Sequence, residues 1–503
     1  MIFLDKLRLW ISRNLAPVVF LAAYFVTVVL GNIIYWLPFG RALLEKEPYT
    51  ANILGFETLF SAGYWFLLFL PFLVTPIVIV LVRGALGKVL ERGARQFFDF
   101  SKSEYCFVVT LSYAFVLYSL VKADAFSLFL AGTDSVSSVE ARFQIRNQLG
   151  FAPIAVLMSV LHYLSIYSLV RWMLEKGKFW LVVTVVNAIL MSVFLTLLNM
   201  KWPILIFYAG LVLAVFVYAK RYAYLKTVMG GVLLVIMYFL VSAFVFRLVP
   251  PVAVVPVVES VVPAPEETID SIPSIPSIPS IPSVRNEQTE TTMPLEDGLG
   301  VIEEHSGKVA EAVATQEDKK HSSVVDNVMN VGEAAAENAP MLLFNVVNRM
   351  AIIYPYYYQV FTTEGTVCGG VLAQAKIGKE CRPSTYIYSR IFNDNFKGRG
   401  TAPAAVHISA YALGGWPVAL MGLIFASIIL GLFASLPLNV SASIGSLAIT
   451  GGIVGYHFSQ LPGEGPIFYD HGVFWTLLVL FLFSGWRLIR NRVGQGKRNL
   501  DIQ

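Results

Sequence analysis

The sequence predicts an all-α polytopic membrane protein with about ten transmembrane helices, both termini in the cytoplasm and a large extracytoplasmic loop between helices 7 and 8. Three observations predict this fold class. The composition is apolar, with 56% hydrophobic residues, 14% charged residues and a mean hydropathy of +0.66, unlike that of an average soluble domain. Apolar runs of about 20 residues, long enough to cross a bilayer core, recur along the chain. Basic residues concentrate in alternate connections between these runs.

The apolar runs divide into about seven before the large loop and about three after it, which places membrane bundles at residues 1–249 and 403–503. The first run follows charged residues and has no small-residue cleavage site, so we expect a retained span and not a signal peptide. The expected spans are residues 15–37, 59–82, 104–121, 151–173, 179–199, 202–219, 227–249, 411–435, 442–460 and 472–489.

The topology follows from the Lys and Arg residues, which are retained on the cytoplasmic side of short loops. With the N-terminus inside, the inner segments carry about 19 basic residues and the short outer loops about six. Ten crossings also return the basic C-terminal tail to the inside. We therefore interpret the net charge of +4 as topology anchors beside anionic lipid, and not as a nucleic-acid-binding surface.

Residues 250–340 are predicted to be a disordered, acidic extracytoplasmic linker. The stretch from Ser271 to Ser283 repeats the triplet Ile-Pro-Ser, and acidic residues without aromatic ones follow it. Such a segment cannot bury enough apolar surface to become ordered. Two interpretations stay open: a tether or docking strip for an envelope partner, and an insertion that the loop tolerates at small cost.

Residues 341–402 are predicted to be an ordered extracytoplasmic substrate loop. A stripe of apolar residues at helical spacing predicts a short helix from about Leu342 to about Pro355, and the tyrosines after this proline suit a membrane interface. Cys368 and Cys381 both lie outside, where a disulfide is favoured over a metal pair. Cys106 lies within an expected span and serves as a small apolar residue.

Ionisable side chains are scarce in the centres of the expected spans. Transporters and proton-coupled pumps place such groups near the bilayer midplane. His162 is the exception here, and a hydrogen-bonded core histidine accounts for it. The charges lie instead at helix ends and in outer loops, which favours an enzyme that acts on membrane-anchored substrates with extracytoplasmic head groups.

The first candidate cluster precedes the fourth span. Arg142 and Arg146 are four residues apart and would share a helical face. Paired guanidinium groups match a phosphate or pyrophosphate through bidentate, charge-assisted hydrogen bonds. Pairing with Glu140 or with lipid phosphate is an equally acceptable interpretation.

The second cluster is a polar segment that leads into the eighth span. Gly398 and Gly400 would free the backbone to approach an oxygen-rich ligand. The helix expected to restart at residues 401–403 has amides that could assist anion binding, and His407 follows one turn later. The other ionisable residues of this segment are Arg382, Arg390, Asp394, Lys397 and Arg399.

A third, shorter outer loop carries Glu464, Asp470 and His471. An acid beside an imidazole could serve as a general base. Exposed turn residues show the same pattern, so both interpretations stay open.

Two stretches resemble bacterial oligosaccharide repeat-unit polymerases of the O-antigen polymerase (Wzy) type: SSVEARFQIRNQLGF and FNDNFKGRGTAPAAVHISAYALGGWPVALMG. The resemblance covers the organisation of most of the chain, from which the Ile-Pro-Ser and acidic insertion departs. It implies a GT-C-like bundle in the bacterial cytoplasmic (inner) membrane that moves a glycan from undecaprenyl pyrophosphate onto a lipid-linked repeat unit. The product would be O-antigen, capsule or exopolysaccharide, and a chain-length regulator and a flippase would be partners.

This reaction needs stabilisation of the departing pyrophosphate and removal of a proton from the acceptor hydroxyl. For the base we favour His407, followed by Asp394 or His471. No acidic Asp-x-Asp pair lies in a plausible outer position, so we expect no metal and no cofactor. The expected pyrophosphate ligands are Arg142, Arg146, Arg390 and Arg399, with Arg349 and Arg382 as further candidates.

Four alternatives stay open. An O-antigen ligase would share the donor and differ in the acceptor. A polyprenyl-phosphate-sugar-dependent glycosyltransferase would show an acidic pair in the first outer loop, where Glu45 and Glu47 flank Lys46. A lipid-linked oligosaccharide flippase would need a charged central cavity and symmetric halves. An envelope scaffold or receptor would use the acidic loop and leave the arginines dispensable.

Overall fold

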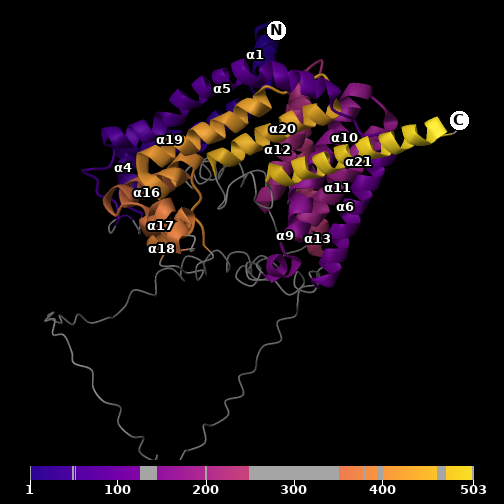
Figure 1. The fold of residues 1–503 in the computed structure, drawn as a ribbon. Helices are drawn as coiled ribbons and strands as arrows, with labels where there is room; N and C mark the ends of the chain where they lie inside the picture. Colours follow the sequence, from indigo (N-terminus) through magenta and orange to yellow (C-terminus); the bar gives the residue numbers. More distant parts are fainter. Residues whose placement is uncertain are drawn as a thin grey trace, which may run out of the picture. The chain divides into compact units, whose positions relative to one another are not determined.

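The computed structural model describes residues 2–47, 50, 53–124, 144–198, 201–247, 350–377, 381–392, 400–460 and 472–500. In these ranges every regular element is a helix (Figure 1). The chain separates into two units, one of residues 1–252 with 341–503 and one of residues 253–340. The predicted linker at residues 250–340 lies outside the described residues.

Eight helices of the described part are long and apolar enough to cross a membrane, which confirms the prediction of an all-α, multi-pass membrane protein. Two of them contain a π-helical turn, at Phe25–Val29 and at Val156–Leu161. The elements that form these eight spans are α2 (Leu15–Tyr24) with α3 (Leu30–Trp36), α5 (Ala62–Gln96), α6 (Lys102–Lys122), α9 (Phe151–Ala155) with α10 (His162–Glu175), α11 (Lys178–Leu197), α13 (Ala223–Arg247), α19 (Val406–Ala434) and α21 (Val473–Leu500).

The remaining helices are shorter or less apolar. Two of them, α12 and α20, coincide with the predicted spans 202–219 and 442–460. The apolar part of α12, Trp202–Tyr218, is shorter than the other spans, and α20 is not among the eight. The total of ten crossings and the orientation therefore stay predictions. These remaining helices are α1 (Ile2–Arg13), α4 (Pro38–Glu45), α12 (Lys201–Tyr218), α16 (Ile353–Thr363), α17 (Gly370–Ile377), α18 (Pro383–Phe392) and α20 (Ala442–Ser459).

Segments that the sequence assigns to the cytoplasm meet at one end of the bundle. Arg83 in α5 donates hydrogen bonds to the carbonyl oxygens of Arg13 (3.0 Å) and Ala434 (2.7 Å). Arg8 donates to the carbonyl oxygen of Ala219. The end of α1, the basic part of α5, the end of α12 and the end of α19 thus lie together, as alternating crossings require.

Asp99, in the connection between α5 and α6, joins three other helices at this same end, two through its carboxylate and one through its backbone carbonyl. It accepts hydrogen bonds from the first backbone amides of α20, those of Ala442 (3.3 Å) and Ser443 (2.9 Å). It also forms an ion pair with Arg171 of α10 at 2.6 Å. Arg487 of α21 donates to the backbone carbonyl of Asp99 (3.3 Å). Asp99 therefore supplies from another segment the acceptors that a helix N-terminus needs.

Helix α20 forms the centre of the bundle although it is weakly apolar. All but two of its 18 residues are buried. It packs along α2, and a Cβ atom at Gly455 would lie 2.2 Å from the backbone oxygen of Ala16. A Cβ at Gly451, four residues earlier, would lie 2.5 Å from the Cβ of Phe433 in α19. Small residues at this spacing let helix backbones approach closely within membranes.

Candidate functional site

The described residues include six of those singled out for a site: Arg146, Arg382, Arg390, His407, Cys368 and Cys381. The other candidates, Arg142, Arg349, Asp394, Arg399 and His471, lie outside the described residues. The structure therefore describes the helices and the disulfide of the predicted substrate loop, but only some of its charged candidate residues.

Helix α16 anchors this loop to the bundle through its tyrosines. Tyr354 donates to the backbone oxygen of Tyr64 in α5 (2.6 Å), and Tyr357 donates to that of Ala402 (2.9 Å). Tyr358 shares a hydrogen bond with Ser61 (2.8 Å), at the N-cap of α5. Because each phenol has an internal partner, these rings can be buried, and α16 is fixed to the end of the bundle opposite Asp99.

Two predictions for this segment need correction. Pro355 does not end a helix as predicted, because a helix, α16, begins at Ile353 and contains it. The rest of the expected helix, from Leu342 to residue 349, lies outside the described residues. Pro355 lies in the first turn of α16, where a proline is tolerated because no helical acceptor is needed for its nitrogen. The tyrosines after Pro355 are predicted at a membrane interface, but Tyr356, Tyr357 and Tyr358 are buried in protein. Tyr354, before the proline, is buried as well.

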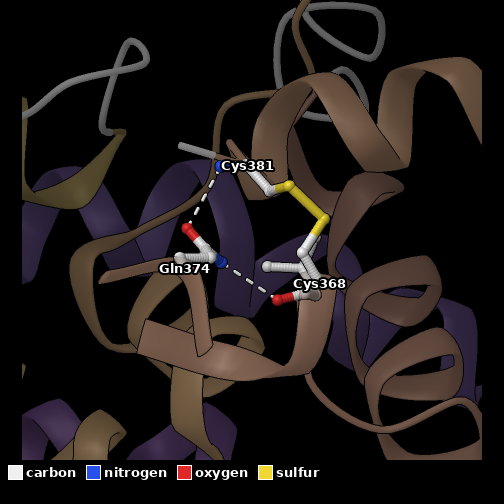
Figure 2. The surroundings of a disulfide bond; sticks show 4 residues. Cys368, Gln374 and Cys381 are labelled. Atoms are coloured by element: carbon white, nitrogen blue, oxygen red, sulfur yellow. Dashed lines mark hydrogen bonds between the residues drawn. A yellow bond between two sulfur atoms is a disulfide. The ribbon is translucent and has the colours of Figure 1, made fainter. Parts of the chain in front are cut away.

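The predicted disulfide is confirmed, since Cys368 and Cys381 are bonded. It closes a loop that contains α17 (Figure 2). Gln374 of α17 points into this loop. Its Nε2 atom donates to the backbone oxygen of Val367 (3.0 Å) and its Oε1 atom accepts from the amide of Cys381 (3.1 Å). The side chain therefore bridges both ends of the closed loop.

Arg390 near the end of α18 is engaged by an acid that the sequence did not single out. Glu364, directly after α16, forms an ion pair with Arg390 and accepts a hydrogen bond from the hydroxyl of Tyr386 (2.8 Å). Burial alone would raise the pKa of Glu364, but these two donors hold it below the ordinary value. The pKa of Tyr386 is raised, mainly because its hydroxyl donates to this carboxylate. Half of the Arg390 side chain remains exposed.

The other two candidate pyrophosphate ligands among the described residues, Arg146 and Arg382, belong to different parts of the fold. Arg146 is half-buried and precedes α9, which packs against α6. Arg382 is exposed and directly precedes α18, which packs against α19. Arg382 directly before α18 and Arg390 in its last turn lie roughly 12 Å apart along the helix axis, at 1.5 Å per residue.

His407 lies in the first turn of α19 and is completely buried. Its Nε2 atom shares a hydrogen bond with the hydroxyl of Tyr24 (3.2 Å), which also donates to the backbone oxygen of Leu68 (3.0 Å). A general base has to reach the proton that it removes, directly or through one water. The placement of His407 thus favours a packing role between α2, α5 and α19.

The structure explains the glycine at position 400 differently from the predicted ligand contact. A Cβ atom at Gly400 would lie 2.0 Å from the ring of Tyr388, so this ring occupies the space assigned above to a ligand. The amide of Ala402, two residues later, donates to the backbone oxygen of Ser384 (2.9 Å). Helix α19 then begins at Val406 and not at residues 401–403.

We expect Gly400→Ala to lower stability by about 2 kcal/mol, because the Tyr388 ring has to move from its place against Gly400. Thermal unfolding of the purified protein measures this change. Removal of the ring should relieve the clash, so Gly400→Ala should cost little when it is added to Tyr388→Ala. An equal loss in both backgrounds would contradict the explanation.

Among the described residues, no group of three His, Cys, Asp or Glu side chains is placed to hold a metal ion. Comparisons of the chain with protein-family models, with curated proteins and with solved structures find no match.

Proposed function

We propose that the protein polymerises undecaprenyl-pyrophosphate-linked oligosaccharide repeat units into O-antigen, capsule or exopolysaccharide chains at the outer face of the bacterial cytoplasmic membrane. The observation that carries the proposal is the distribution of charge relative to the spans. In the described spans, Asp, Glu, Lys and Arg residues are confined to the helix ends and to the part of α5 from Arg83 onward. Arg382 and Arg390 stand instead on a loop anchored to the opposite end of α5 and α19.

This distribution fits a reaction at a lipid-linked head group. Coupled transport places its ionisable groups near the bilayer midplane, whereas a diphosphate beside the membrane requires guanidinium groups outside the spans. The tyrosine anchors of α16 support the proposal as well, because they give the loop a fixed position. A fixed position of hydrogen-bond donors is what stabilises charge in a transition state.

The proposed reaction is a glycosyl transfer. The bond from the anomeric carbon of the growing glycan to the pyrophosphate oxygen breaks, and the acceptor hydroxyl oxygen forms a new bond to that carbon. The hydroxyl proton passes to a base, and the pyrophosphate leaves on its lipid. Arg142, Arg146, Arg390 and Arg399 would stabilise the departing charge, with Arg349 and Arg382 as further candidates. Because His407 is buried, Asp394 and His471 become the first candidates for the base.

The test is replacement of Arg142 and Arg399 separately by Ala and by Lys, with surface glycan analysed in cells that express equal amounts of protein. Loss of one fixed donor should lower the polymerisation rate on the order of 10²-fold, and Lys should restore only part of it because it lacks the planar fork. Glu91→Ala, in an exposed ion pair with Arg95 at the other end of the bundle, is the matched control.

The identity of the accumulated lipid separates the proposal from its nearest alternative. Single repeats on the lipid anchor are expected for a lost polymerase. Long undelivered chains would instead identify an O-antigen ligase. Unchanged polymer length in both Ala variants would refute the assignment of these arginines and favour the scaffold alternative.

A further inference from the structure

The short helix α17 lies inside the disulfide-closed loop. It turns a polar side chain toward the protein and apolar side chains away from it, the reverse of the arrangement expected in water. Gln374 faces inward and is satisfied by two backbone partners. Val371 and Leu372 face outward, with exposures of 45% and 80%. Leu372 is the most exposed large apolar side chain of the described residues. In water the opposite arrangement is expected, since burial of apolar side chains stabilises a fold and burial of an amide does not.

Contacts of α17 place its beginning beside a membrane span. A Cβ atom at Gly370 would lie 2.9 Å from the backbone oxygen of Leu413, and Leu413 lies inside the apolar span Val406–Ala434. Leu413 directly precedes Gly414 and Gly415, where α19 is kinked. The segment before the kink folds back along the rest of the span, since a Cβ atom at Gly422 would lie 2.9 Å from the Cβ of Ala410. The chain of α17 reaches Leu413 through a sharp turn, in which Cys368, Gly369 and Gly370 all have positive φ.

The surface of α19 at and beyond this level is also apolar and exposed. Trp416, three residues after Leu413, packs against Phe66 of α5 with ring centroids 5.6 Å apart and is 38% exposed. Tryptophan is enriched where the bilayer core meets the head groups. Farther along α19, Met421 and Phe425 are exposed by more than half. The outward face of α17 therefore continues the surface that a polytopic protein turns toward lipid.

We propose that α17 is inserted into the membrane leaflet on the side of the substrate loop, where phospholipid acyl chains cover Val371 and Leu372. Lys376 lies one turn after Leu372 on the same exposed face. It extends toward the phosphate groups, as long basic side chains do at the edge of a bilayer. The disulfide and Gln374 hold the closed loop together at both ends, so α17 is already folded when it inserts into the leaflet. This inference does not depend on the proposed glycosyl transfer.

The test uses the full-length protein in nanodiscs of phosphatidylethanolamine and phosphatidylglycerol, which contain no polyprenyl lipid. The photoreactive residue p-benzoylphenylalanine replaces Leu372. After irradiation, intact-mass spectrometry should show a mass increase of one phospholipid. Replacement of Phe425, an exposed apolar residue within the span of α19, is the positive control. Replacement of the exposed Arg382 is the control for a water-facing position.

Labelling of position 372 by phospholipid at a yield comparable with that of position 425 is the expected result. The proposal is overturned if position 372 gives no lipid adduct while position 425 does. It is also overturned if position 372 crosslinks to a second copy of the chain, which would identify α17 as a contact between protomers. Monodisperse elution and an intact disulfide in each variant show that a negative result does not come from misfolding.

Discussion

Replacement of Gly455 by alanine should destabilise the protein by about 3 kcal/mol, or prevent recovery of monodisperse protein altogether. The added methyl group would lie 2.2 Å from the backbone oxygen of Ala16 and 3.3 Å from the backbone nitrogen of Phe20. A backbone cannot rotate away as a side chain can, so α2 and α20 would have to separate along their contact. The gain in helix propensity from glycine to alanine, about 1 kcal/mol, is too small to offset this.

The chain offers controls for this experiment with the same chemical change. At Gly452, in the same helix, the nearest atom to an added Cβ is the side-chain Cγ of Leu15 at 3.2 Å, which can give way. At Gly84 of α5 nothing lies within 4 Å. Heating followed by size-exclusion chromatography should show Gly455→Ala far below wild type, Gly452→Ala near it and Gly84→Ala equal or higher. Equal stability of Gly455→Ala and Gly84→Ala would contradict the close packing of α2 and α20.

Replacement of Asp99 by alanine should cost about 3 kcal/mol, because it removes one of two acceptors from a partly buried guanidinium and the charged acceptor from two helix amides. The side chains of Asp99 and Arg171 are 23% and 22% exposed. Arg171 keeps its second partner, Glu175, at 2.6 Å, whereas the amides of Ala442 and Ser443 lose a charged acceptor. Asp99→Asn keeps one acceptor oxygen and should therefore cost less than Asp99→Ala.

An exposed ion pair in the preceding helix provides the contrast. Glu91 and Arg95 lie at 2.7 Å, with side-chain exposures of 49% and 67%, and such pairs contribute at most about 1 kcal/mol. Glu91→Ala should leave the unfolding temperature nearly unchanged. The double variant Asp99→Ala with Arg171→Ala should lose less than the sum of its two single variants, since the two residues act as one unit. Strict additivity would show that the pair is not coupled.

The membrane-spanning framework could be predicted from the sequence because lipid imposes a simple rule on it. A span must be apolar over about 20 residues whatever it packs against, and all ten predicted segments are helical at their centres. The disulfide was predictable for a similar reason, since Cys368 and Cys381 were the two cysteines expected outside. The sequence does not predict α16 at its observed place, because Pro355 is as well suited to the first turn of a helix as to its end.

The polar contacts could not be predicted because they join residues that are far apart in the chain. Asp99 lies among basic residues in a connection, and nothing in its neighbourhood indicates that it accepts the amides of α20, 343 and 344 positions away. The sequence around Glu364 likewise gives no sign that it pairs with Arg390, 26 positions away. The arginines before His407 favour it as a base, whereas its burial against Tyr24 depends on tertiary packing alone.

The small, hydroxyl-bearing and glycine residues of α20 have a consequence for biogenesis. A helix surrounded by other helices gains little from contact with acyl chains, so its own sequence supplies only a weak signal for leaving the translocation channel. We expect it to enter the bilayer paired with α19, to which it is joined by residues 435–441. Its stable residence would then be established only after α2, made early in synthesis, closes against it.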